Sequence, residues 1–454
     1  MLVGIIIGSG IFISPSIVVE SVHDYGLSLL IWIVSGIICL LGALCYCELG
    51  CMNPKGGGTY AMMSFAYGRI AGFLTSWTFA FLVDPTAVAI VALTLGQYVM
   101  KPLHEYITPN PLYEKGIAAA AIILVTVSNA LSLKAVTKLQ LLFAACQIGA
   151  VTFLVILGIW QMAHGRVEYL QGMFTNLHFD MKFIGRIGSA LYGTLWAYNG
   201  WQLVSNVTEE MEHVEKNLFR AVVSACPVVT LCYTAVNIAL MTTLSPTEMK
   251  NSTAVGVQFA EIVAGKWASY VMPILVALSC YGSINAYMFA CGRVTLAAGR
   301  EGHMPRLFGM IHRERNTPIP AYILTCTITI MMLMPNASNI KVLIILASTS
   351  SWVIYGSSIL SVIVLRFTKA ECYRPFRVSI VVPIFMSLVS LFLVLVPFSE
   401  TPIIASVAVG LIILGLPVYY FLIKIESSHP IWFISAKEWF YKRAEKNMNL
   451  VACS

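Results

Sequence analysis

The sequence predicts an all-α membrane protein, and three observations carry this prediction. The 454 residues are 58% hydrophobic and only 11% charged, which leaves too little polar surface to cover a water-soluble globule. Apolar runs of the length that spans a bilayer recur along the chain. Two of these runs, the first and the sixth, are interrupted near their middle by glycine. A polytopic helical bundle with two broken helices is therefore expected.

About twelve transmembrane helices are expected from runs of roughly 20 apolar residues. The runs cover residues 1–19, 27–49, 64–99, 116–131, 139–162, 184–207, 219–244, 267–298, 321–334, 340–365, 380–397 and 401–423. The first run is short, so we expect helix 1 to be truncated on its cytoplasmic side. Residues 1–424 form the predicted polytopic membrane domain, and residues 425–454 form an amphipathic tail in which aromatic residues mix with Lys and Arg.

The basic residues predict the orientation of the bundle. If the first helix runs outward from the cytoplasm, most of the 28 Lys and Arg residues fall on inner connections, including 303–315 and 366–377. Both termini are then cytoplasmic. This asymmetry accounts for the net charge of +7, so no nucleic-acid partner is expected, and the lipid bilayer is the expected surrounding.

The first interrupted run predicts a binding site. Residues 5–15 read IIIGSGIFISP, and Gly8, Ser9 and Gly10 favour unwinding in the middle of the helix. Inside a membrane, unwound backbone is tolerated only where it is buried in protein or lines a cavity. The helix that resumes near Ile11 would direct free N–H groups and a positive dipole end at a carboxylate. The alternative is that the glycines only let two helices pack closely.

The sixth run shows the same interruption. Residues 195–211 read LWAYNGWQLVSNVTEEM, and the helix is broken at 197–200, near the middle of the span. Breaks in the first and sixth helices are typical of an inverted repeat of five plus five helices, here about 1–162 and 184–366, with extra helices at about 380–423. Trp196 and Trp201 flank the break and could close over an apolar side chain.

Several polar side chains lie inside predicted spans. Asp84 occupies the middle of the third helix, where it either pairs with a cation or lines a wet vestibule. Gln147 in the fifth helix could reach a ligand or a carbonyl of the broken helix, although a bond to a neighbouring helix is the commoner use. Ser279 and Ser283 are spaced i, i+4 on the eighth helix and could hold a sodium ion, although serine in a helix usually bonds to its own backbone.

Other chemistry is not expected. Nearly all of the 12 cysteines lie in apolar runs and none lies on an outer connection, so a disulfide framework is not predicted. The sequence shows no spacing typical of a metal site and no catalytic constellation, so we expect no cofactor and no enzyme activity. Asn251 and Asn336 lie in glycosylation sequons on outer connections.

Four motifs, in order, resemble those of the L-type amino acid transporter light chains, a branch of the amino acid, polyamine and organocation superfamily. They are GSGIF at 8–12, LWAYNGW at 195–201, VTEEM at 207–211 and GREGHMP at 299–305. The resemblance implies a leucine-transporter-type fold, in which five-helix inverted repeats are followed by two more helices. It also implies sodium-independent exchange of L-amino acids across the plasma membrane by alternating access.

The resemblance also implies roles for individual residues. The carboxylate site matches Ser9, Gly10 and Ile11, amino-group acceptors are carbonyls around the two breaks, and Trp196 matches the gating aromatic. The implied substrate-binding residues are Ile6, Ile7, Gly8, Ser9, Gly10, Ile11, Trp196, Ala197, Tyr198 and Asn199.

The chain departs from the family pattern at four places. The outer loop 101–115 lacks the cysteine that joins some members to a glycoprotein heavy chain, so no disulfide-linked partner is expected, and a non-covalent one stays open. Asn199 stands where relatives that take cationic substrates have Asp, which disfavours lysine or arginine as preferred cargo. Gln147 replaces a common lysine and Gln202 a common asparagine, so we expect these two to affect gating and coupling.

The sequence therefore predicts exchange of neutral amino acids with large aliphatic or aromatic side chains. One alternative is a cationic and neutral exchanger or an ion-coupled symporter that uses Asp84, Ser279 and Ser283. The other is a polytopic scaffold or receptor that does not transport.

Overall fold

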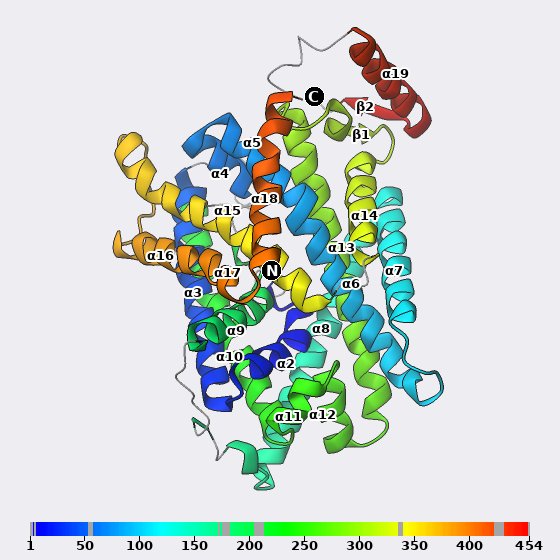
Figure 1. Ribbon diagram of the computed structural model, residues 1–454, viewed down its shortest axis with the longest axis vertical. Helices are drawn as coiled ribbons and strands as arrows, with labels where there is room; N and C mark the ends of the chain where they lie inside the picture. The colour runs from blue at the N-terminus through cyan, green and yellow to red at the C-terminus, as the bar shows by residue number, and fades with distance from the viewer. Residues whose placement is uncertain are drawn as a thin grey trace.

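The computed structural model describes residues 3, 6–52, 58–170, 173–174, 182–203, 213–334, 339–421 and 431–452. Within these residues the chain is almost entirely helical, and Figure 1 shows the helices gathered in one elongated bundle. Nine helices in the described ranges are long and apolar enough to cross a membrane. The predicted all-α membrane fold is confirmed.

The long helices coincide with nine of the twelve predicted runs. They are α3 (Tyr25–Met52), the continuous span Arg69–Leu103, α7 (Pro111–Leu131), α8 (Leu133–Ala163), α10 (Val214–Met241), α13 (Ala268–Arg300), α15 (Ile340–Thr368), α16 (Val381–Leu395) with α17 (Pro397–Glu400), and α18 (Pro402–Tyr419). The span Arg69–Leu103 contains α5 (Arg69–Thr78), the π-helical turn η1 (Phe79–Val83), α6 (Asp84–Met100) and the start of η2 (Lys101–Glu105).

The three remaining runs form shorter helices. They are α2 (Gly10–Val22), α9 (Phe183–Ala197) and α14 (Ile319–Leu333). The first two of these follow or precede the predicted breaks, because α2 begins only at Gly10 and α9 ends at Ala197. Figure 1 shows α2 and α9 side by side within the bundle, and the two helices are in direct contact.

The connections carry further short elements that the hydropathy of the chain did not predict. These are α4 (Gly58–Tyr67), α11 (Pro246–Asn251), α12 (Val255–Ala264) and the 3-10 turns η3 (Glu168–Leu170) and η5 (Arg306–Gly309). A capping box between Ser245 and Glu248 starts α11. Figure 1 places α11 and α12 at one end of the bundle and α4 at the other.

The C-terminal segment folds back onto the α4 end of the bundle. It comprises α19 (Ile431–Met448) and the strand β2 (Leu450–Ala452), which pairs antiparallel with β1 (Met310–His312). Ile311 stands opposite Val451 in this ladder. The strand therefore links the tail to the connection between α13 and α14 (Figure 1).

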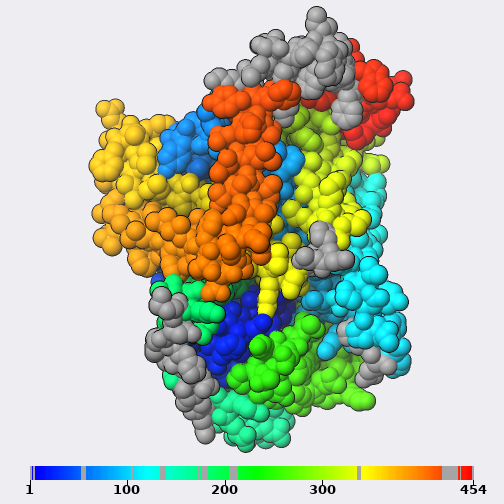
Figure 2. Space-filling view, in the orientation of Figure 1, coloured from blue at the N-terminus to red at the C-terminus, as the bar shows by residue number. Residues whose placement is uncertain are grey.

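One flank of the bundle is apolar and open to its surroundings. Only 33% of the α16–α17 span and 22% of the α18 span are buried inside the protein. Figure 2 shows these helices, in orange, forming one side of the molecule. Their exposed side chains include Val381, Leu388 and Ile403. Such a surface suits lipid, as expected for a polytopic membrane protein.

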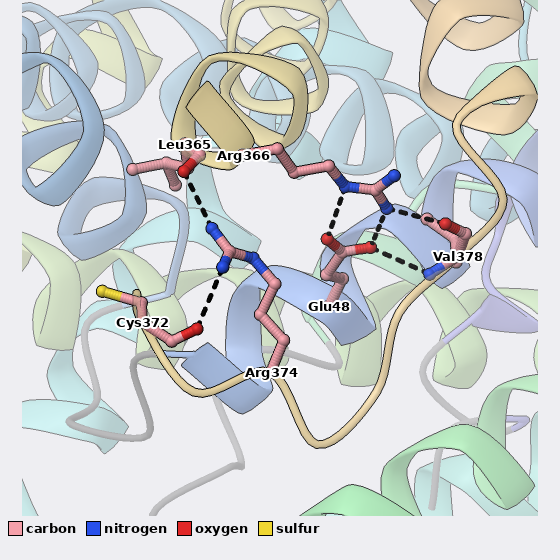
Figure 3. A network of polar contacts seen from close by, with 6 residues as sticks. All are labelled: Glu48, Leu365, Arg366, Cys372, Arg374 and Val378. Atoms are coloured by element: carbon pink, nitrogen blue, oxygen red, sulfur yellow. Dashed lines mark hydrogen bonds and ion pairs between the residues drawn. The ribbon is translucent and has the colours of Figure 1, made fainter. Parts of the chain in front are cut away.

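A buried ion pair joins α3 to α15 (Figure 3). Arg366 of α15 donates to both oxygens of Glu48 on α3, with an Nε–Oε1 distance of 3.0 Å and an Nη2–Oε2 distance of 2.6 Å. Glu48 also accepts from the amide of Val378 at 2.9 Å, in the connection to α16. This bidentate geometry is the strongest form of such a pair. At the other end of α15, Lys341 pairs with Glu20 of α2.

Candidate functional site

The first break leaves unsatisfied amide groups at the start of α2. The amide of Ile7 still donates to Val3 O at 2.8 Å, and that of Phe12 to Ser9 O at 3.1 Å. Between them, within the described chain, the amides of Ser9, Gly10 and Ile11 have no backbone acceptor. Ser9, Gly10 and Ile11 are all buried, so these donors are shielded from bulk water.

The two breaks touch each other, and glycine makes this contact possible. A Cβ atom added to Gly10 would lie 2.6 Å from Ala197 Cα, closer than real Cβ atoms approach. Gly8, by contrast, has only ordinary contacts around it. Close packing, one of the two interpretations of this stretch, is therefore observed at Gly10.

Tyr233 of α10 joins the two breaks through a single hydroxyl. Its Oη lies 2.9 Å from Ile6 O and 3.0 Å from Ala197 O. The ring is fully buried, between Trp32 and Tyr198. Tyr198 itself donates to Trp32 O at 3.1 Å and does not reach the break carbonyls. One side chain thus holds the ends of two interrupted helices together.

Gln147 of α8 also contacts the first break. Its Nε2 donates to Ile7 O, which is one of the two positions considered for it from the sequence. Gln147 is buried, so this amide fixes a carbonyl that the unwound helix leaves free.

The second break is closed by its own side chains. After α9, the backbone turns through Gly200 with φ +116°, a conformation that favours glycine. Asn199 Oδ1 accepts from the Gly200 amide at 2.9 Å and from Gln202 Nε2 at 2.8 Å. Gln202 therefore orders the turn, and residues 204–212, with the whole of the VTEEM motif, lie outside the described residues.

A pocket opens beside the second break. It is lined by Leu195, Trp196, Asn199, Trp201, Ser348, Ser351, Trp352 and Tyr355. Residues of α9 and of the turn that follows it form one wall, and residues of α15 form the other. Trp201 packs against Tyr355 with ring centroids 5.3 Å apart. The pocket is therefore mainly aromatic, with hydroxyl groups along the α15 wall.

The candidate ion residues lie on two other helices. Ser279 is fully buried and, in the described part of the chain, its hydroxyl has no hydrogen-bond partner. Ser283 is half-buried one turn further along α13. Cys280, beside Ser279, directs its thiol at Ser9 of the first break. Asp84 begins α6 and accepts a hydrogen bond from the thiol of Cys291.

The two glycosylation candidates have different positions. Asn251 ends α11 and is exposed. Asn336 lies outside the described residues.

Sequence reasoning missed several residues that contact the site. Tyr233, Tyr98 and Tyr287 lie in apolar spans, and Tyr98 donates to Phe12 O at 2.9 Å. A buried phenol needs a hydrogen-bond partner, so a tyrosine in mid-span was a usable signal. The identity of the partner depends on how separate helices pack, which the sequence alone does not give.

Comparison with known proteins supplies the family. The family model described as amino acid permease matches residues 1–430. The chain is 39% identical to the b(0,+)-type amino acid transporter 1 of Mus musculus over 422 residues, which cover 93% of this chain and 85% of that protein.

Two further relatives have related names. The chain is 38% identical to the large neutral amino acids transporter small subunit 2 of Mus musculus, over 92% of this chain and 78% of that protein. It is 34% identical to the Asc-type amino acid transporter 1 of the same species, over 92% and 79%. The resemblance to amino acid transporter light chains is confirmed, and the chain belongs to the amino acid permease family.

Proposed function

We propose that this protein exchanges neutral amino acids with large side chains across the plasma membrane, independently of sodium. The observation that carries the proposal is the contact between two broken helices, which brings free amides and backbone carbonyls into one buried space. An amino acid carries a carboxylate and an ammonium group, so it needs donors and acceptors side by side.

The start of α2 suits the carboxylate. The unpaired amides of Ser9, Gly10 and Ile11 point out of a 13-residue helix whose N-terminus carries a partial positive charge. The nearby carbonyls of Ile6, Ile7, Trp196 and Ala197 are the acceptors for the ammonium group. We propose that Gly8, which lies between these amides and these carbonyls in the chain, leaves room for the backbone of the substrate.

The aromatic pocket suits the side chain of the substrate. Trp196, Trp201 and Trp352 supply apolar surface, and Ser348 and Ser351 can bond to a polar tip. Trp196 lines the pocket next to the break, so we propose that it closes over the bound substrate. Gln147 and Gln202 hold the two breaks in place and so set how easily they open.

The relatives support the remaining parts of the proposal. Their printed names specify amino acid transporters, and one is a small subunit, which supports a second subunit for this chain as well. Because loop 101–115 has no cysteine, we propose a non-covalent partner. The excess of basic residues on the inner connections supports cytoplasmic termini. The proposed cycle makes and breaks no covalent bond, so no residue is catalytic.

The test compares two glycine substitutions in purified protein reconstituted into vesicles loaded with radiolabelled leucine. In Gly10→Ala the new methyl group collides with Ala197, whereas Gly149→Ala on α8 places it in open space. We expect leucine efflux only when an external amino acid is present. Gly10→Ala should lower this exchange at least about tenfold, because the added methyl group forces the two breaks apart and misplaces the groups that bind the substrate, and Gly149→Ala should not. Normal exchange by Gly10→Ala would refute the site.

Replacing sodium by choline separates exchange from symport. If Ser279 and Ser283 hold a sodium ion that drives uptake, choline abolishes uptake. Exchange that continues in choline supports the proposal. Absence of exchange with every external amino acid would favour the non-transporting scaffold.

A further inference from the structure

Asp84 lies deep in the bundle at an irregular point of its helix. It stands near the middle of the span Arg69–Leu103, where the π-helical turn η1 passes into α6. Such turns inside α-helices are frequent at functional sites. In this span 83% of the residues are buried, so Asp84 lies deep within the protein, although its own side chain keeps some exposed surface.

The carboxyl group has no cationic partner within the described chain. The carboxyl group accepts a hydrogen bond from the Cys291 thiol. It also interacts electrostatically with the phenol groups of Tyr287 on α13 and Tyr355 on α15. These three are the titratable groups that face it. No lysine or arginine among the described residues pairs with it. An ionised carboxylate at this depth without a counter-charge is strongly disfavoured.

Asp84 is connected to the pocket by two side chains. Tyr355 lines the pocket and lies within electrostatic reach of Asp84. Tyr287 also lies within reach, and its hydroxyl is 3.5 Å from Nδ2 of Asn199, another lining residue. A substrate side chain that enters the pocket therefore approaches the carboxyl group across Asn199 and Tyr355.

From this geometry we propose that Asp84 is a site shared by a proton and the cationic end of a basic amino acid. The proposal rests on the proposed function and widens its substrate class. With a neutral amino acid bound, Asp84 carries a proton on its carboxyl oxygen. With lysine bound, that O–H bond breaks, the proton leaves to the aqueous phase, and the carboxylate pairs with the ammonium group. The loaded site has the same net charge in both cases.

A transport experiment follows protons during exchange. Vesicles that hold the purified protein are loaded with leucine and a pH-sensitive dye, and lysine or leucine is added outside. For every lysine that enters, one leucine and one proton leave, so the lumen becomes alkaline. Leucine added outside moves protons equally in both directions and leaves the luminal pH unchanged.

Variants assign this behaviour to the carboxyl group. In Asp84→Asn we expect lysine exchange relative to leucine exchange to fall at least tenfold and the lysine-dependent alkalinisation to vanish. Asp84→Glu should retain both. Glu261→Gln, a change of an exposed carboxylate on α12, is the matched control and should behave as wild type.

A binding measurement decides the proposal even if no exchange is seen. In detergent-solubilised protein, lysine and the proton compete for Asp84, so the Kd for lysine should weaken by up to about tenfold for each pH unit of acidification. Asp84→Asn should remove this dependence. Three results would overturn the proposal: a Kd for lysine that does not change with pH, lysine transport without proton release, or the same preference for lysine over leucine in Asp84→Asn as in the wild type. Loss of leucine exchange with pH-dependent lysine binding intact would instead count against the exchange function alone.

Discussion

Tyr233 offers the most selective test of the site at the level of a single atom. Replacement by phenylalanine removes the hydroxyl that contacts Ile6 O and Ala197 O, and we expect the KM for leucine exchange to rise. The lost buried hydrogen bond should also destabilise the protein by about 1–3 kcal/mol.

Tyr25→Phe is the matched control for this prediction. Tyr25 donates to Leu244 O at 2.6 Å in an equally buried place that is separate from the breaks. Both variants should lower the thermal unfolding midpoint in detergent, but only Tyr233→Phe should change the KM. An equal change in KM for the two would show that the effect is merely structural.

We expect the stability of the protein to depend on pH through His303, which follows the end of α13. Its Nδ1 lies 2.5 Å from the Tyr60 hydroxyl, so it connects α13 to α4. Burial lowers the pKa of His303, and Arg69 lowers it further, while Glu301 acts in the opposite direction. Since the neutral ring is favoured in the folded state, its contribution is complete above the ordinary histidine pKa of about 6.5 and is lost as the pH falls through the lowered value.

We therefore expect acidification from pH 7 to pH 5 to lower the unfolding midpoint of the wild type more than that of His303→Gln. The measurement is a pair of melting curves in detergent at each pH. Identical acid shifts in the two proteins would exclude His303 as the source.

At the scale of elements, the ion pair between Glu48 and Arg366 holds α3 against α15. Both side chains are nearly fully buried, with exposures of 0% and 7%. Arg366→Met leaves the Glu48 carboxylate buried without a partner, which should cost about 3–5 kcal/mol. The double variant with Glu48→Met should recover much of this loss, because two apolar side chains need no counter-charge. Unfolding midpoints give the comparison, and a double variant less stable than the single one would contradict it.

The elements also show what the sequence can and cannot predict. The long helices follow from apolar runs alone, and the ends of α2 and α9 follow from glycine in the middle of two such runs. The strands β1 and β2 could not be predicted, because each has three residues and its partner lies far away in the chain. The helices α11 and α12 were not predicted, because hydropathy identifies segments long enough to span a membrane and not short helices in a connection.

The same limit applies to the candidate site. The residues of the two breaks were predicted because unwinding is a local property of Gly8, Ser9 and Gly10. The contact of both breaks with Tyr233 was not predicted, because it depends on how α10 packs against them, whereas the bond from Gln147 to a carbonyl of the first break was one of the alternatives that the sequence left open. Asp84 was recognised as unusual from its depth in the span, but its neighbours on α13 and α15 required the structure.

At the scale of the whole molecule, the two breaks, the pocket and Asp84 draw on residues of α2, α6, α9, α10, α13 and α15, while α16 and α18 lie at the outer flank. We therefore expect a change of substrate to move several helices around this set of residues. The anchors at the two ends of α15 lie outside it. Binding residues and anchoring residues can therefore be altered separately.

The hydroxyl of Tyr233 has one proton, yet two carbonyls compete for it. At any instant only one of Ile6 O and Ala197 O can accept that proton. Without substrate, the other carbonyl oxygen therefore lacks the Tyr233 donor. A bound ammonium group supplies the missing donor and removes a penalty of about 1–3 kcal/mol. A difference of 1.4 kcal/mol corresponds to a factor of about ten in an equilibrium, so we expect this contact to favour the loaded form over the empty one.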